Sequence, residues 1–235
     1  MRLEVHDLVA GYGTLDVVRD VNLTVGHQEW VALVGAVGAG KSALMGAIAG
    51  SLPVRRGRIE LDGADVSALP AHDRVGRGVA LVPEGRRLFA GMSVEENLAT
   101  GAYRARGPAA RERLDRVFAL FPVLAERRRQ QVGTLSGGEQ QMCAIGRALA
   151  CGPRALLIDE LSLGLAPIVR DRLVDALIEI RRDGTSLLVV DQDLEGSLTV
   201  ADRGYLVRNG EIVTSGPASA LLDDPTFTRE YLGMV

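Results

Sequence analysis

The one lysine of the chain stands in a stretch whose spacing suits phosphate binding. Lys41 is the sole lysine among 27 lysines and arginines, and residues 35–42, GAVGAGKS, fit the pattern G-x-x-x-x-G-K-[ST]. Glycines let a backbone wrap a polyphosphate with its N–H groups inward, and a following helix start adds partial positive charge. An ammonium is a compact charge on a flexible stem, whereas arginine's fork holds its donors in fixed directions. We therefore predict that Lys41 reaches the β- and γ-phosphates of a nucleotide and that Ser42 binds Mg²⁺.

Two adjacent acids could complete such a site. Asp159 and Glu160 directly follow the apolar run at 155–158. Neighbouring carboxylates at the end of a buried strand repel each other and lose hydration unless a cation lies between them. We expect Asp159 to bind Mg²⁺, directly or through water, and Glu160 to orient or deprotonate an attacking water.

Four short apolar runs must position these side chains, and each ends abruptly in polar residues or glycine. The runs lie at 31–34, 79–82, 155–158 and 187–190. Stretches with helical spacing lie at 41–50, 109–120, 136–151 and 167–182. This alternation predicts an α/β fold with a mostly parallel, buried sheet, whose ligands bind at the carboxyl ends of the strands. Glu84 and Gln192 follow two of the runs, so we expect both beside the phosphates, Glu84 on the metal or its water.

A second helix start suited to phosphate follows at 135–141, LSGGEQQ. Ser136 and Glu139 have the spacing of a capping box. Gly137 and Gly138 remove side chains from the helix start and leave bare N–H groups and a helix dipole. One chain cannot easily fold this segment onto its own phosphate loop, so we infer a second subunit.

Taken together, these motifs resemble the ATP-binding subunits of ABC transporters over nearly the whole chain. The resemblance implies one P-loop ATPase domain over 1–235, with an N-terminal antiparallel β subdomain and a helical subdomain inserted at about 86–150. It implies ATP and Mg²⁺ as cofactors, and two ATP sandwiched in a head-to-tail dimer whose signature residues, Ser136 to Glu139, complete the opposite site. Tyr12 matches the aromatic residue that stacks on adenine. The implied phosphate-side ATP contacts are Gly35, Ala36, Val37, Gly38, Ala39, Gly40, Lys41, Ser42 and Ala43.

Further segments, including LVPEGRRLFAGMSVEENLATG, LSLGLAP and ADRGYLVRNGEIV, are similar to one subfamily. It is the second ATP-binding subunit of branched-chain amino acid importers. The similarity implies membrane permeases, a sister ATP-binding subunit (or a second copy) and, indirectly, a solute-binding protein as partners, at the cytoplasmic face of the membrane. Relatives that carry urea, short amides or other amino acids stay open as alternatives. A soluble ATP-gated clamp and a non-hydrolysing binder also stay open, although the chain has no long insertion and Glu160 is present.

Composition argues against two other kinds of protein, one that binds nucleic acid and one that spans a membrane. The net charge of −3 does not favour nucleic acid as a partner. The apolar runs of four or five residues are far shorter than the ~20 residues needed to cross a bilayer.

Several residues depart from the family pattern. Most members have glutamine at Glu84 and histidine at Gln192, so Gln192 can only hydrogen-bond a γ-phosphate or water. Val37 replaces an asparagine, Ala43 a hydroxyl residue that reaches the α-phosphate, and Leu161 a proline. Asp191 and Asp193 likewise replace a glutamate and an asparagine beside Gln192. Because a hydroxyl contact to a charged phosphate is lost, we predict weaker ATP binding than in a typical member.

Overall fold

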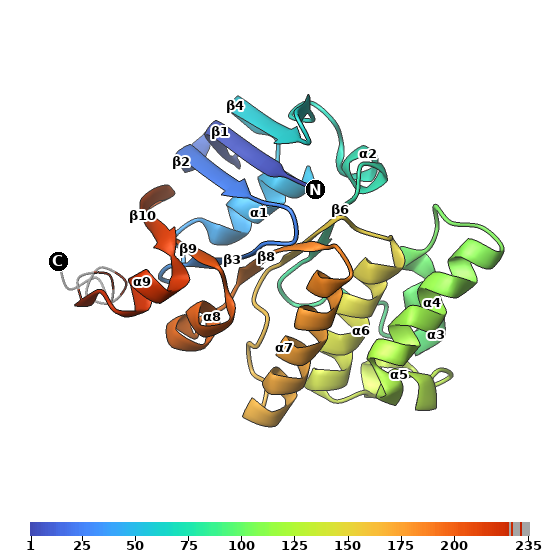
Figure 1. Cartoon of the computed structure of the whole chain (residues 1–235). Coiled ribbons are helices and arrows are strands. Elements are labelled where there is room, and N and C mark those ends of the chain that lie inside the picture. Colours follow the sequence, from blue (N-terminus) through green and yellow to red (C-terminus); the bar gives the residue numbers. More distant parts are fainter. Residues whose placement is uncertain (226, 228–230, 232–235) are drawn as a thin grey trace.

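Two sheets form the frame of the molecule (Figure 1). The computed structural model describes residues 1–225, 227 and 231. The antiparallel sheet has the order β2-β1-β4-β5 and comprises β1 (Leu3–Tyr12), β2 (Leu15–Val25), β4 (Val54–Leu61) and β5 (Ala64–Asp65). The core sheet has the order β10-β9-β3-β8-β7-β6 and comprises β3 (Trp30–Val34), β6 (Val79–Val82), β7 (Ala155–Ile158), β8 (Ser186–Val190), β9 (Arg203–Arg208) and β10 (Glu211–Pro217).

Strands β6, β7, β8, β3 and β9 run parallel, and β10 pairs with β9 in the antiparallel sense. The prediction of a mostly parallel core sheet and an N-terminal antiparallel sheet is thereby confirmed. All four predicted strands are present, each within one residue of the expected bounds.

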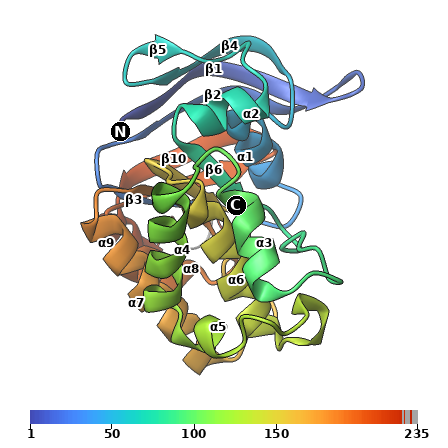
Figure 2. The same ribbon diagram turned by 90° about the vertical axis from the view of Figure 1, so that its right-hand side faces the viewer.

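The described helices cover both faces of the core sheet. They are α1 (Lys41–Ala49), α2 (Ala71–Gly76), α3 (Val94–Gly101), α4 (Pro108–Leu120), α5 (Pro122–Glu126), α6 (Gly137–Ala150), α7 (Pro167–Arg182), α8 (Leu194–Val200) and α9 (Ala218–Leu222), with a 3₁₀ turn at Val132–Thr134. Helices α3, α4 and α5 all contact α6 and lie away from the antiparallel sheet (Figure 2). The chain between β6 and β7 is therefore helical, and the bounds of a separate subdomain at 86–150 stay a prediction.

Strand β3 contributes to three hydrophobic clusters, one on one face and two on the other, because side chains alternate between the faces of a strand. Val31 and Leu33 pack with α1 and the antiparallel sheet. Ala32 and Val34 pack with α8 and α9, while Trp30 joins the cluster formed with α6 and α7. Because both faces of β3 are buried, its register against the neighbouring strands is fixed. The position at which the phosphate loop begins is fixed with it.

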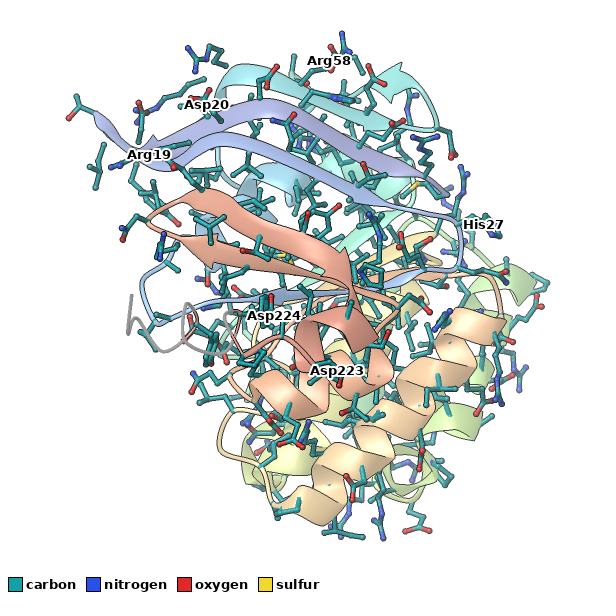
Figure 3. The ribbon with its side chains drawn as sticks, turned by 60° about the vertical axis from the view of Figure 1, so that its left-hand side comes forward. Arg19, Asp20, His27, Arg58, Asp223 and Asp224 are labelled. Carbon is teal, nitrogen blue, oxygen red and sulfur yellow. The ribbon has the colours of Figure 1, made fainter. Side chains whose placement is uncertain are left out.

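The antiparallel sheet buries one face and exposes the other. Its strand β1 alternates buried and half-buried positions along much of its length, as expected of a sheet with one wet face. Charged side chains such as Arg19, Asp20 and Arg58 are exposed on this sheet (Figure 3). Among residues 1–225, 227 and 231, no helix has the length and apolarity that crossing a membrane requires.

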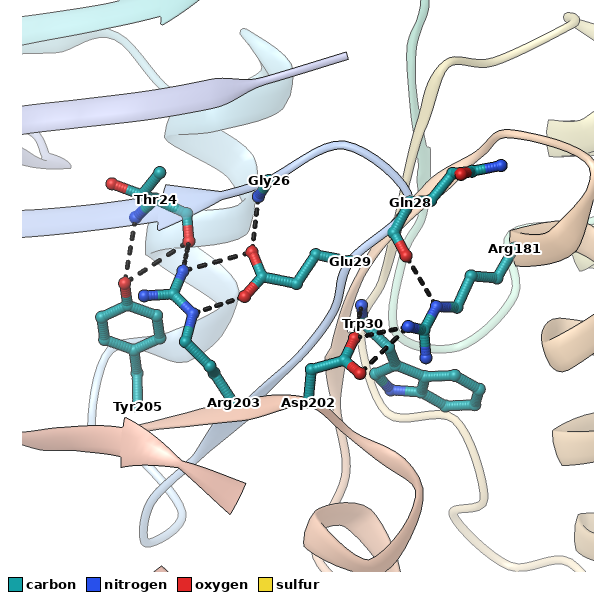
Figure 4. A network of polar contacts seen from close by, with 9 residues as sticks. All are labelled: Thr24, Gly26, Gln28, Glu29, Trp30, Arg181, Asp202, Arg203 and Tyr205. Carbon is teal, nitrogen blue, oxygen red and sulfur yellow. Dashed lines mark hydrogen bonds and ion pairs between the residues drawn. The ribbon is translucent and has the colours of Figure 1, made fainter. Parts of the chain in front are cut away.

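A polar network ties the connection between β2 and β3 to the core (Figure 4). Arg203 of β9 forms an ion pair with Glu29. Asp202 accepts the backbone N–H of Trp30 at 2.9 Å and pairs with Arg181 of α7, also at 2.9 Å. Because both guanidinium groups bridge separate segments, the network fixes the point at which β3 begins.

Candidate functional site

The carboxyl ends of β3, β6, β7 and β8 meet at one edge of the core sheet, as parallel strands require. They enclose a cavity of about 250 Å³. Ten of the predicted site residues line it: Tyr12, Val37, Gly38, Gly40, Lys41, Ser42, Ala43, Glu84, Glu160 and Gln192. Gly35, Ala36 and Ala39 belong to the same loop, and Asp159 ends β7 beside it. Residues up to 180 positions apart in the sequence are thus brought to one place.

The phosphate loop is wrapped around its own lysine. Lys41 begins α1, is only 6% exposed, and donates hydrogen bonds to the carbonyl oxygens of Gly35 at 2.7 Å and Ala36 at 2.9 Å. Gly40, at the N-cap of α1, has φ of 105°, which favours glycine. Burial lowers the pKa of Lys41, and the carboxylates at the neighbouring strand ends oppose that shift. The ammonium therefore lies against two backbone carbonyl oxygens of the loop, next to a helix start where an anion is favoured.

Two carboxylates are buried here without enough partners. Asp159 is 5% exposed, and its Oδ1 together with Glu160 Oε2 are buried oxygens with no hydrogen-bond partner among the described residues. Burial raises the pKa of Asp159, while a hydrogen bond from the Ser42 side chain lowers it. Burial also raises the pKa of Glu160. Buried oxygens of this kind are costly unless a cation binds them, so the donor set fits a divalent metal.

Within the described residues, no group of three or more His, Cys, Asp or Glu side chains is placed to hold a metal by itself. Mg²⁺ that enters with a nucleotide would need no such group, because such an ion keeps water and phosphate oxygens and needs only one or two protein carboxylates. Ser42 and Asp159 carry the protein oxygens that such an ion would use. Glu84 lies across the cavity and is exposed.

Glu160 is held in an unusual backbone conformation. Its φ is 63°, in the left-handed region that non-glycine residues seldom adopt, and strain of this kind collects at functional sites. A hydrogen bond from Gln192 lowers its pKa against the effect of burial. We expected Gln192 to bond phosphate or water, which stays a prediction, and the structure adds a contact of its amide with the carboxylate of Glu160.

The residues of the LSGGEQQ segment lie outside the cavity, at the start of α6. The predicted capping box is present, because Ser136 Oγ accepts the backbone N–H of Glu139 at 3.3 Å and Glu139 Oε2 accepts that of Ser136 at 2.8 Å. Gly137 is exposed, whereas Gly138 is buried. A Cβ on Gly138 would lie 2.4 Å from Cγ1 of Val169 in α7. The second glycine therefore has a packing reason that the sequence did not reveal.

Three of the residues that depart from the family pattern form hydrogen bonds with nearby residues. Leu161 donates its backbone N–H to Val190 of β8 at 3.0 Å, a bond that proline could not make. Asp191 accepts from the Ser162 hydroxyl at 2.8 Å. Asp193 accepts the Gly196 N–H at 3.1 Å, and it caps α8.

Two residues near the site were missed by the sequence analysis. Val17 of β2 lines the cavity beside the phosphate loop. Tyr231 donates its hydroxyl hydrogen to the Gln192 carbonyl oxygen at 2.8 Å, and burial raises the pKa of this tyrosine. Neither belongs to a motif with a chemical signal, so only the fold could bring them to the site.

Known proteins are similar to this chain in sequence and in fold. The profile of the ABC transporter family matches residues 18–162. A Pseudomonas aeruginosa protein described as the high-affinity branched-chain amino acid transport ATP-binding protein BraG is 43% identical, over 94% of this chain and 95% of its own. A probable branched-chain amino acid transport ATP-binding protein, LivF of Archaeoglobus fulgidus, is 34% identical over 97% of each chain. The Escherichia coli lipopolysaccharide export ATP-binding protein LptB is also 34% identical, over 98% of this chain and 97% of its own.

Solved structures agree at the level of the fold. A nucleotide-free ATP-binding cassette from an ABC transporter superposes with a TM-score of 0.88 at 23% identity, covering 98% of this chain and 99% of its own. The ATP-binding subunit of another ABC transporter gives a TM-score of 0.81 at 28% identity, covering 100% of this chain and 94% of its own.

Proposed function

Because the chain belongs to the ABC transporter family, we propose that it is the ATP-hydrolysing subunit that powers an importer of branched-chain amino acids. The assignment of branched-chain amino acids as the cargo rests on the similarity to BraG. The sequence identity to BraG is 43%, against 34% to the lipopolysaccharide export protein. Similarity to LivF points the same way. Importers of urea, short amides or other small solutes remain the alternative that an uptake measurement must separate.

We assign ATP binding to the cavity at the carboxyl ends of the strands. Lys41 binds the β- and γ-phosphates after leaving the carbonyl oxygens of Gly35 and Ala36, and the start of α1 supplies backbone N–H groups. Exposed Tyr12 stacks on the adenine from the opposite wall. The rest of the loop, including exposed Val37, surrounds the phosphates without a side-chain hydrogen bond.

The same proposal assigns Mg²⁺ to Ser42 and Asp159, with Glu84 on the metal or its water. When bound, the ion neutralises phosphate charge that builds up during transfer. The two buried oxygens without partners, on Asp159 and Glu160, support a cation at this place. Without one, three carboxylates (Glu84, Asp159 and Glu160) face the single ammonium of Lys41.

Glu160 acts as the general base toward the attacking water. Burial raises its pKa, which makes the carboxylate a stronger base, and the Gln192 hydrogen bond holds it in place. Gln192 keeps the same charge across the physiological pH range, so its part is to orient Glu160, the water or the γ-phosphate. Glu84 borders the same space from the end of β6.

The signature residues act on a second nucleotide. Ser136 accepts one backbone N–H and keeps its own hydroxyl hydrogen for a phosphate oxygen, while exposed Gly137 leaves the helix start open. Since this surface lies outside the chain's own cavity, it supports a head-to-tail dimer, with a sister ATP-binding subunit or a second copy. ATP closes the dimer, and hydrolysis opens it.

We place the subunit at the cytoplasmic face of the membrane, against permease subunits that receive solute from a solute-binding protein. Three large apolar or aromatic side chains between β6 and α4 are exposed and suit such a contact: Phe89, Met92 and Tyr103. No nucleic acid takes part.

The test is affinity purification of the tagged protein from detergent-solubilised membranes with ATP present. Recovery with two permeases and a sister ATPase is expected, and labelled leucine uptake should fall when Lys41→Ala replaces the wild type. Labelled urea uptake serves as the matched control. A protein recovered alone from the soluble fraction would contradict a transport role, and loss of urea uptake alone would contradict the cargo.

A further inference from the structure

The loop that follows Glu84 carries an arginine in an unusual setting. Gly85, Arg86 and Arg87 have φ of 72°, 63° and 45°, a run of three left-handed residues. Two of these are not glycine, so the conformation is strained and must be held from outside. Arg147 of α6 holds it by donating to the carbonyl oxygens of Arg86 at 2.9 Å and Arg87 at 2.8 Å. The loop is thereby fastened to the helix that starts with the signature residues.

The side chain of Arg86 is then fixed against the same helix. Its Nε donates to Gln141 Oε1 and its Nη1 to Gln140 Oε1, both at 3.1 Å. Gln141 is 4% exposed, so that acceptor is itself immobilised by packing. The third nitrogen, Nη2, lies toward the helix start, where a Cβ built on Gly137 would be 3.4 Å away.

This placement is electrostatically unfavourable in the isolated chain. A guanidinium stands near the positive end of a helix dipole, where an anion is favoured and a cation is not. Its two acceptors are neutral amides, and no ion pair joins Arg86 to a carboxylate anywhere in residues 1–225, 227 and 231. The adjacent carboxylate of Glu139 is engaged by Arg127 at 3.0 Å and by the capping box. None of the described carboxylates therefore neutralises the positive charge of Arg86, which is available to an external anion.

We propose that Arg86 binds the γ-phosphate of the ATP held by the partner subunit, alongside Ser136 and the N–H groups of the α6 start. The inference rests on the head-to-tail dimer of the proposed function and adds to it a cationic residue supplied in trans. It also explains the use of arginine: a planar fork can bond both glutamines and still direct one nitrogen outward, which a lysine could not.

The test measures ATP-driven dimerisation in a chain that binds ATP without turning it over. In a Glu160→Gln background, Arg86→Met is expected to weaken dimerisation with ATP about tenfold to a hundredfold, the scale of a lost charge-assisted hydrogen bond. Affinity of the monomer for a fluorescent ATP analogue should not change, since the residue serves the opposite site. Arg87→Met is the matched control, because that exposed side chain neighbours Arg86, and it should dimerise as the parent does.

A further variant separates phosphate binding from loop support. Gln140→Leu removes one acceptor of Arg86, together with the amide's own hydrogen bonds to the carbonyl oxygens of Val132 and Leu135, but keeps the charge, so it should weaken the dimer less than Arg86→Met. Equal weakening by the two variants, or equal loss of analogue binding by the monomer, would assign Arg86 to loop support and overturn the inference. Arg86→Met dimers as stable as the parent's would overturn it as well. A parent that stays monomeric with ATP would contradict the dimer itself and therefore both proposals.

Discussion

At the scale of the residue, the site contains a buried carboxylate that no other group of the described chain fully stabilises. Asp159 is buried with one oxygen lacking a partner, and burial raises its pKa. An acid with a raised pKa in the folded state binds more protons there than in the unfolded chain. Stability therefore falls as pH rises from the ordinary carboxyl pKa through the raised one, and the cost is fully present above it.

Asp159→Asn should accordingly be more stable than the wild type when no nucleotide is present. At pH 7 we expect its melting temperature to rise by a few degrees, the shift that roughly 1 kcal/mol gives a domain of this size. The difference should vanish as pH is lowered through the carboxyl range. Asp171→Asn, on the exposed part of α7, is the control and should melt with the wild type. Mg-ATP should stabilise the wild type but not Asp159→Asn, and an unchanged or lowered melting temperature without nucleotide would refute the argument.

Substitution of Ala43 tests the prediction that this chain binds ATP more weakly than a typical member of the family. It is 4% exposed in the first turn of α1 and lines the cavity, so a hydroxyl there would reach the nucleotide. Ala43→Thr should bind a labelled ATP analogue about tenfold more tightly in an equilibrium titration. Ala43→Val adds the same bulk without the hydroxyl and should show no gain. Equal affinities for the threonine and valine variants would contradict the explanation.

How far the sequence predicts a residue's place depends on whether its signal is local. Lys41, Ser42, Asp159 and Glu160 follow strands whose apolar runs are visible in the chain, so their meeting at one edge was predictable. The contact of Gln192 with Glu160, the packing of Gly138 on α7 and the approach of Tyr231 were not. Each depends on side-chain distances between segments far apart in sequence, which no periodicity encodes.

At the scale of the element, long periodic helices were predicted and short ones were not. Helix α7 spans Pro167–Arg182 against an expected 167–182, and α4 begins one residue early, at a proline in the first turn. Helices α2, α5, α8 and α9 have five to seven residues, too few for a periodic pattern to show. These helices are held by tertiary contacts.

Arg74 is such a contact, since it joins α2 to the end of the phosphate-loop helix. It is 2% exposed and donates to four carbonyl oxygens, those of Ala47 at 2.6 Å, Ile48 at 2.9 Å, Ser67 at 2.7 Å and Leu69 at 2.9 Å. Arg74→Met should lower the free energy of unfolding by about 3 kcal/mol, because buried carbonyl groups lose their partner.

Urea denaturation would measure this difference, with Arg77→Met as the control at the exposed end of the same helix. Since Arg74 touches no site residue, the surviving folded fraction should bind ATP normally. A variant as stable as the control would show that the four carbonyl groups find other partners.

At the scale of the whole molecule, the proposed function makes each chain the source of one half of two different sites. The start of α6 does not line the cavity at the strand ends, so under that proposal a complete site would need two chains. Nucleotide binding and turnover can then be measured separately, the first as formation of the dimer and the second as release of phosphate.

Glu160→Gln should bind ATP, form a stable dimer and hydrolyse at least about 10²-fold more slowly, the scale of a lost general base. Light scattering after size exclusion measures the dimer, and phosphate release measures turnover. Lys41→Ala, which removes the phosphate contact, should fail to dimerise. Near-normal turnover by the Glu160→Gln variant would remove Glu160 from its assigned role.

The order of the core sheet also governs how the chain is made. Strand β3 lies between β8 and β9, whose sequences follow it by more than 150 residues. A ribosome adding 5–20 residues each second needs roughly 10–35 s to pass from the end of β3 to the end of β9. Throughout that interval the hydrophobic strand that leads into the phosphate loop lacks at least one of its two neighbours. The nascent chain therefore cannot complete its nucleotide site before β8 has been synthesised, and until then the apolar side chains of β3 are available for chaperones to bind.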